Sequence, residues 1–186
     1  TTTGNGTDFG DLTTLTQELG AFSSSSRAVF FGGKAIASGT GQGTVTNVIQ
    51  YVTIASTGDA ADFGDLTAAN AQSPAGVSSN TRGVRVGGRG DGGIINVMDY
   101  VAIATTGNAT DFGDMVQAAN TAYSCNSSTR GIVSGGVENA VLDVIQYITI
   151  ASAGDSTDFG NLGSALYQGS NGIVSSATRG IVALGG

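Results

Sequence analysis

The sequence of 186 residues contains no histidine or tryptophan, one proline and one cysteine. The absence of histidine excludes His-based acid–base catalysis, His-dependent triads and nearly every zinc or copper site. The single thiol, Cys125, has no disulfide partner within the chain, and we interpret it as a small buried apolar side chain. Apolar runs extend over only a few residues, so we expect no insertion into a membrane.

Charge is also scarce, and it is mostly negative. Only 11% of the residues are charged, and 14 acidic against 7 basic residues give a formal net charge of −7. This excess of acid opposes binding to nucleic acid or to an anionic membrane. The 31 glycines follow no three-residue period, which excludes collagen, and the 40% apolar content argues against disorder. This composition predicts many short strands joined by glycine turns.

Three sequence markers recur in a fixed order. The first contains the tripeptide Asp-Phe-Gly, with aspartates 54, 49 and 47 residues apart at Asp8, Asp62, Asp111 and Asp158. The second is an arginine segment that ends in two glycines, at Gly32-Gly33, Gly87-Gly88, Gly135-Gly136 and Gly185-Gly186. The third is a β-branched segment at Asn47–Ser56, Asn96–Thr105 and Asp143–Ser152. A period of this size is typical of propeller blades.

The markers predict a unit of four strands, A to D. We expect A strands at Leu19–Ser24, Ala75–Ser79, Ala122–Ser127 and Gly172–Ser176, B strands such as Arg82–Gly88, C strands at the third marker, and D strands within Gly4–Leu12, Thr57–Leu66, Thr106–Met115 and Ala153–Leu162. Stretches such as Met115–Asn120 are interpreted as connectors. Because strand side chains alternate, both faces of Asn47–Ser56 are largely apolar and must be covered.

The order of these elements resembles the kelch repeat. The double glycines match that repeat, as do the tyrosines Tyr51, Tyr100 and Tyr147, whereas Phe9, Phe63, Phe112 and Phe159 stand where kelch units carry tryptophan. The whole set is also similar to repeats in structural and tail-fibre-like proteins of marine bacteriophages. The resemblance implies an all-β, kelch-like β-propeller of about four repeats of four antiparallel strands, in one domain over residues 1–186. The repeats span approximately residues 1–56, 57–105, 106–152 and, incompletely, 153–186.

The strand count is uneven, because A, B and D are expected four times and C three times. An unpaired edge would result. We therefore expect part of a larger propeller or a propeller completed by another subunit, in preference to four blades closed within one chain. An open solenoid that joins head to tail is a third alternative.

Repeated charges are interpreted as structural. Arg27, Arg82, Arg130 and Arg179 occupy one repeat position, and Asp8, Asp62, Asp111 and Asp158 occupy another. We expect each arginine to pair with a carboxylate or to donate to backbone carbonyls between blades, in preference to an arginine ring that binds an anionic ligand. Asp59, Asp62 and Asp65 are weak calcium candidates, although turn capping is the favoured interpretation. No other metal or cofactor is expected.

The B–C loops differ most between repeats, and a rigid scaffold with dissimilar loops is a common binding surface. The candidate binding residues there are Lys34, Arg89, Asp91, Glu138 and Asn139; Arg89-Gly90-Asp91 also spells an adhesion tripeptide. The copper oxidases that share the kelch fold need histidine ligands, so their activity is not carried over. We expect no enzyme, but a structural or interaction module of a virion or extracellular appendage.

The expected partners are other virion subunits, a second copy of the chain, or a host-surface glycan or protein. The alternatives are a glycan-binding lectin and a carbohydrate-active enzyme with scattered acids.

Overall fold

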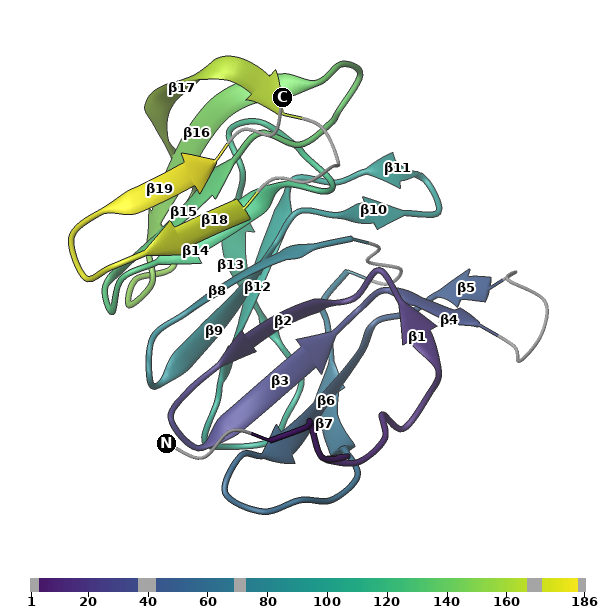
Figure 1. Ribbon diagram of the computed structural model, residues 1–186. Helices are drawn as coiled ribbons and strands as arrows, with labels where there is room; N and C mark the ends of the chain where they lie inside the picture. The colour runs from purple at the N-terminus through teal and green to yellow at the C-terminus, as the bar shows by residue number, and fades with distance from the viewer. Residues whose placement is uncertain (1–3, 37–42, 69–72, 167–171, 184–186) are drawn as a thin grey trace.

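The computed structural model describes residues 4–36, 43–68, 73–166 and 172–183, and within these ranges it contains strands and turns but no helix. Three four-stranded antiparallel sheets follow one another along the chain, and a two-stranded sheet follows them (Figure 1). In each four-stranded sheet the strands are adjacent in the order in which they occur in the sequence. The prediction of an all-β fold made of antiparallel units is thereby confirmed.

The strands of the sheets have the following bounds. The first sheet contains β2 (Gly20–Ser23), β3 (Arg27–Phe31), β6 (Val48–Thr53) and β7 (Ala61–Asp65). The second contains β8 (Ala75–Ser78), β9 (Arg82–Val86), β12 (Val97–Ala102) and β13 (Thr110–Asp114). The third contains β14 (Tyr123–Asn126), β15 (Arg130–Ser134), β16 (Leu142–Thr149) and β17 (Thr157–Leu166). The fourth pairs β18 (Gly172–Ser175) with β19 (Gly180–Ala183).

The predicted strands agree with these bounds to within a few residues, except at the start of the chain. Residues Gly4–Leu12 carry the D-strand motif but form no strand. The other three D motifs each pair with the C strand that precedes them in the chain. The described residues offer no such C strand to Gly4–Leu12, so the prediction of a D strand there was wrong.

Two small sheets were not predicted. The first B–C loop forms β4 (Lys34–Ile36) and β5 (Gly43–Val45), and β1 (Thr16–Gln17) pairs with β4. The second B–C loop forms β10 (Arg89–Gly90) and β11 (Gly93–Ile94). Figure 1 shows both hairpins extending from the same side of the molecule.

The first strands of successive sheets lie side by side, β2 against β8, β8 against β14, and β14 against β18. Side chains tie these inner strands together: Ser78 Oγ donates to Ser23 O (2.8 Å) and Ser175 Oγ donates to Asn126 O (2.9 Å). A cavity of about 520 Å³ is lined by residues from all four inner strands and the turns after them. Among the described residues, no strand of the fourth sheet pairs with the first sheet.

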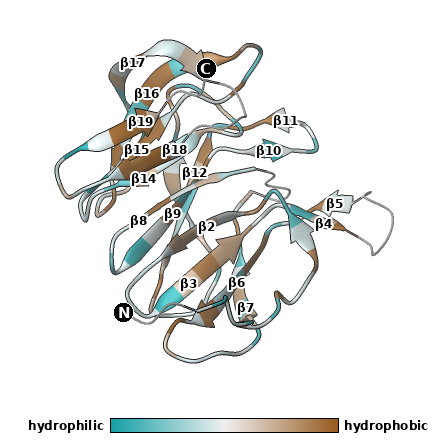
Figure 2. Ribbon diagram, viewed as in Figure 1, coloured by the Kyte–Doolittle hydropathy of each residue, from teal (hydrophilic) through white to brown (hydrophobic). Residues whose placement is uncertain are grey.

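Each of the two apolar cores spans two neighbouring sheets. In the first core, Phe31 and Phe63 of the first sheet pack with Val101 and with Ile103, which directly follows β12 of the second sheet. In the second core, Phe112 of the second sheet packs with Ile148 and Ile150 at the end of β16. Figure 2 shows hydrophobic colouring along these strands, while the turns are paler. Both faces of the central strands of the second sheet are therefore covered. In the first C strand, for which coverage of both faces was predicted, Ile54 is 43% exposed.

The double glycines allow the end of the B strand to approach the backbone of the connector closely. Gly135 and Gly136 have φ angles of 64° and 93°, a region that favours glycine. A Cβ on Gly136 would lie 2.6 Å from the carbonyl oxygen of Asn120, where the connector crosses the end of the B strand. The predicted pair Gly185-Gly186 lies outside the described residues.

Candidate interaction surfaces

Three of the four repeat arginines lie over aromatic rings of their own sheets. In each pair, the guanidinium carbon of the B-strand arginine lies over the ring of the C-strand tyrosine. The distances to the ring centroid are 4.4 Å for Arg27 and Tyr51, 4.2 Å for Arg82 and Tyr100, and 4.3 Å for Arg130 and Tyr147. Stacking of this kind holds the planar guanidinium in a fixed orientation.

Two of these arginines also join neighbouring sheets. Arg27 Nη1 donates to the Ile103 carbonyl (2.9 Å), and Arg82 Nη1 donates to the Ala151 carbonyl (2.8 Å). Ile103 directly follows the C strand of the second sheet, and Ala151 lies two residues after the end of the C strand of the third sheet. For the Arg130 guanidinium, the described residues offer no hydrogen-bond acceptor.

Of the two roles predicted for the repeat arginines, donation to backbone carbonyls of the neighbouring sheet is confirmed for Arg27 and Arg82. Pairing of a repeat arginine with a carboxylate is not found in the described part of the chain. The one ion pair among the described residues joins Arg85 to Asp99, and it involves neither a repeat arginine nor a repeat aspartate. The repeat aspartates lie on the D motif and are exposed: Asp8, Asp62, Asp111 and Asp158. Two of them cap their own turns, because Asp8 accepts from Gly10 N (3.2 Å) and Asp158 accepts from Gly160 N (2.9 Å). Arg179, directly before β19, is exposed.

A buried polar position in the C strand was missed by the sequence analysis. Gln50, Asp99 and Gln146 occupy this position in the three sheets and are almost fully buried. Each accepts a hydrogen bond from a main-chain N–H just after the D motif of the preceding repeat. The donors are Thr13 (2.8 Å), Thr67 (2.9 Å) and Gln117 (3.0 Å), respectively. The recurrence of one polar residue in an apolar strand was the signal that could have revealed this contact.

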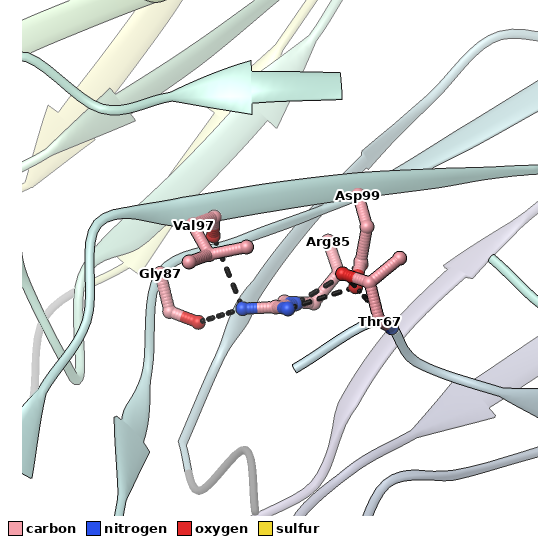
Figure 3. Close-up of polar contacts among 5 residues, drawn as sticks. All are labelled: Thr67, Arg85, Gly87, Val97 and Asp99. Carbon is pink, nitrogen blue, oxygen red and sulfur yellow. Dashed lines mark hydrogen bonds and ion pairs between the residues drawn. The ribbon is translucent and has the colours of Figure 1, made fainter. Parts of the chain in front are cut away.

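In the second sheet this position carries a charge that is fully partnered. Arg85 donates from Nε to Asp99 Oδ1 (3.0 Å) and from Nη2 to Asp99 Oδ2 (2.8 Å), and both side chains are 1% exposed. Arg85 Nη1 also donates to the carbonyls of Gly87 and Val97, both at 3.0 Å (Figure 3). Thr67 Oγ1 donates to Asp99 Oδ2 (2.7 Å), so the carboxylate links two sheets. Ionised groups can be buried when they are satisfied in this way.

The turn between the C and D strands of each four-stranded sheet donates hydrogen bonds to the D motif of the preceding repeat. These bonds recur in all three four-stranded sheets. Main-chain N–H groups of Gly58, Gly107 and Gly154 donate to the carbonyls of Phe9 (2.8 Å), Phe63 (2.7 Å) and Phe112 (2.6 Å). The residue after each turn glycine, Asp59, Asn108 or Asp155, accepts a main-chain N–H of the same preceding motif.

The calcium candidates do not form a metal site in the described part of the chain, which contains no group of three or more potential ligands close enough to hold an ion. Asp59 instead accepts from Asp11 N (3.0 Å), a residue of the preceding repeat, so this bond joins two repeats and does not cap the turn of Asp59 itself. Asp65 N donates to Asn108 Oδ1 (3.1 Å). Asp62 is exposed on β7.

A cleft of about 370 Å³ separates the third sheet from β18 and β19. The third sheet contributes Ile132, Ser134, Ile145 and Phe159 to its lining, and β19 contributes Val182. Phe159 is 58% exposed, although Phe63 and Phe112 at the same repeat position are each 2% exposed. The cleft is therefore an apolar surface. The equivalent surface is covered at the first junction, between the first and second sheets, and at the second junction, between the second and third sheets, but it is open at the third junction, between the third and fourth sheets.

Cys125 lies on β14 at this cleft, and it is buried and free of disulfides. Burial raises the pKa of its thiol, because desolvation disfavours the thiolate.

The candidate binding residues lie in three separate B–C loops. Lys34 is half-buried on β4, Arg89 is exposed on β10, and Asp91 is exposed in the turn between β10 and β11. In the third loop Asn139 is exposed, and Glu138 Oε2 accepts from Gln117 Nε2 (2.6 Å). The structure does not bring these five side chains together by any hydrogen bond or ion pair.

No helix in the described ranges combines the length and the apolar character needed to cross a membrane. Comparison with known proteins gives no family assignment, since no protein-family model and no curated protein matches the chain.

Proposed function

We propose that the chain is a non-catalytic structural and interaction module, in which a propeller-like arc of sheets presents variable loops. The observation that carries this proposal is a contrast between two regions. The junctions repeat the same carbonyl, glycine and buried polar contacts, whereas the B–C loops form a three-stranded sheet, a short hairpin and an irregular loop. A constant scaffold with diverse loops is suited to recognition.

The kelch-like propeller is the architecture that best accounts for the packing. Four inner strands line one cavity, and the first and second sheets each pack against the end of the C strand of the sheet that follows. Propeller blades bury their apolar faces against one another in this manner. The resemblance to tail-fibre-like repeats supports a place in a virion or other extracellular appendage.

The loops at β4–β5 and β10–β11 are the proposed contact surface for a subunit or a host surface. Arg89 and Asp91 are exposed there and take part in neither apolar core. A glycan is the alternative ligand class, favoured by the many hydroxyl and amide groups around the central cavity, such as Ser79, Asn80 and Ser176.

The test compares the full chain with a variant that carries Arg89→Ser and Asp91→Ser. We expect both proteins to unfold at the same temperature, and we expect the variant to lose binding in a screen against a glycan array and against intact particles or cells. A control with Thr105→Ala, an exposed residue of a C–D turn that neither lines the cavity nor belongs to the loops, should keep both properties. Turnover of a polysaccharide by the unaltered chain, abolished by an Asp→Asn change, would overturn the proposal.

A further inference from the structure

We propose that the cleft between the third sheet and β19 accepts a β-strand from another polypeptide. The accepted segment has the sequence character of residues 47–66, which form a C strand, the glycine turn and a D strand. This surface is distinct from the B–C loops, so the inference goes beyond the proposed function. It rests on a comparison of the third junction with the two junctions before it.

The first two junctions show which residues cover this surface. Phe63 packs with Val101 and Ile103, and Phe112 packs with Ile148 and Ile150, two apolar residues in alternate positions at the end of the next C strand. At the third junction, Phe159 is the equivalent aromatic residue and lines the cleft. An occupant therefore needs two β-branched side chains two positions apart, as Val52 and Ile54 have at the end of the first C strand.

Arg130 provides a polar contact for the same occupant. Its guanidinium stacks on Tyr147 with the geometry that Arg27 and Arg82 show, and it lines the cleft. Arg27 and Arg82 donate to main-chain carbonyls just after the next C strand. Arg130 is therefore oriented for a carbonyl of an accepted strand.

Gly160 provides space for the glycine turn of the occupant. A Cβ on Gly64 would lie 2.6 Å from the carbonyl carbon of Gly107, and a Cβ on Gly113 would lie 2.6 Å from that of Gly154. No atom lies within 4 Å of the equivalent position at Gly160. The third D strand thus has open space at the position where the first two D strands contact the glycine turn of the next sheet.

Two further features mark the cleft as an acceptor. Within the described residues β19 pairs with β18 alone, so one edge of β19 is available for main-chain hydrogen bonds. Ser134 is 1% exposed and lines the cleft, and among the described residues its Oγ has no hydrogen-bond partner. An unpaired buried hydroxyl favours an occupant that supplies a polar atom.

The residue of β19 that faces the accepted strand determines which strand is preferred. The register pairs Phe30 with Gln50, Arg85 with Asp99, and Val133 with Gln146. Val182 occupies the position of Val133 in β19, so it favours glutamine on the accepted strand. An aspartate there would be buried without an arginine.

The test measures binding of labelled peptides to the full chain by fluorescence anisotropy. We expect saturable 1:1 binding of a peptide with the sequence of residues 47–66, and at least tenfold weaker binding of a peptide with the sequence of residues 96–115, which carries aspartate. Val182→Arg should reverse this preference. Phe159→Ser should weaken binding at least tenfold. Phe9→Ser should not, because Phe9 occupies the same repeat position on the first D motif, away from the cleft, and is also exposed (37%).

Three results would overturn the inference. They are no binding of the 47–66 peptide, equal binding of a scrambled peptide, and binding that is insensitive to both Val182→Arg and Phe159→Ser. A self-associated chain that the peptide does not dissociate would instead assign the cleft to a second copy. None of these outcomes alters the loop-binding assay, so failure of this inference and failure of the proposed function can be distinguished.

Discussion

At the scale of single residues, the position occupied by Gln50, Asp99 and Gln146 is the most informative. A glutamine there needs only its carbonyl to accept the hydrogen bond from the preceding repeat, whereas Asp99 brings a negative charge. The charge is compatible with burial because Arg85 lies directly opposite on β9. The second sheet therefore contains a matched pair of residues where the third contains Val133 and Gln146.

Arg85→Val should lower the free energy of unfolding by about 3–5 kcal/mol, because it leaves a buried carboxylate unpaired. The double change Arg85→Val with Asp99→Gln reproduces the pair of the third sheet, and we expect it to restore stability to within about 1 kcal/mol of the original. Urea denaturation measures both values. Equal instability of the single and double variants would contradict this account.

The arginines that stack on tyrosine are predicted to differ in their contributions to stability. Arg82→Ala removes both the stacking on Tyr100 and the hydrogen bond to Ala151, and should cost about 1–2 kcal/mol. Arg130→Ala removes only the stacking on Tyr147 and should cost about 0.5 kcal/mol. Thermal unfolding of the two variants provides the measurement, and an equal loss would show that the inter-sheet bond contributes nothing.

At the scale of strands and turns, the sequence was sufficient to predict the A to D strands of the sheets, because each strand has its own alternation and each turn has its own glycines. It was not sufficient at Gly4–Leu12, where the D motif is present but no strand forms. The Arg–Tyr stacks and the connection from Thr13 to Gln50 were not predicted. These contacts depend on how one sheet lies against the next, which spacing along the chain does not determine. The exception is Arg85 with Asp99: both depart from the repeat together, and this joint departure was a readable signal.

The D-strand glycines provide a test of the junction geometry. Gly113 and Gly160 have similar φ angles of 132° and 127°, so an alanine is strained at both positions. Only at Gly113 would the new Cβ also collide with the turn at Gly154. We expect Gly113→Ala to cost about 1–3 kcal/mol more than Gly160→Ala in chemical denaturation. A smaller cost at Gly113 would contradict the observed approach.

At the scale of the whole molecule, the described sheets contact their neighbours in sequence, as the units of a repeat protein do. The second sheet is packed on both sides, whereas β18 and β19 pack on the third sheet alone. Local stability should therefore decrease toward the fourth sheet.

We expect hydrogen–deuterium exchange to be faster for amides of β18 and β19 than for amides of β8 and β9. Mass spectrometry of peptide fragments measures this difference. The 47–66 peptide should slow exchange in β19 and leave β9 unchanged. Uniform protection across the four sheets would indicate instead that the molecule unfolds as one cooperative unit.

The ion pair between Arg85 and Asp99 has a consequence for recombination between the DNA repeats that encode the sheets. Recombination between similar DNA repeats lengthens or shortens an array, and a crossover within the C–D turn would keep both members of the pair in the same copy. A crossover in the β10–β11 hairpin would separate them and leave a lone charge in the interior of the hybrid. Selection should therefore tolerate the first kind of rearrangement and remove the second.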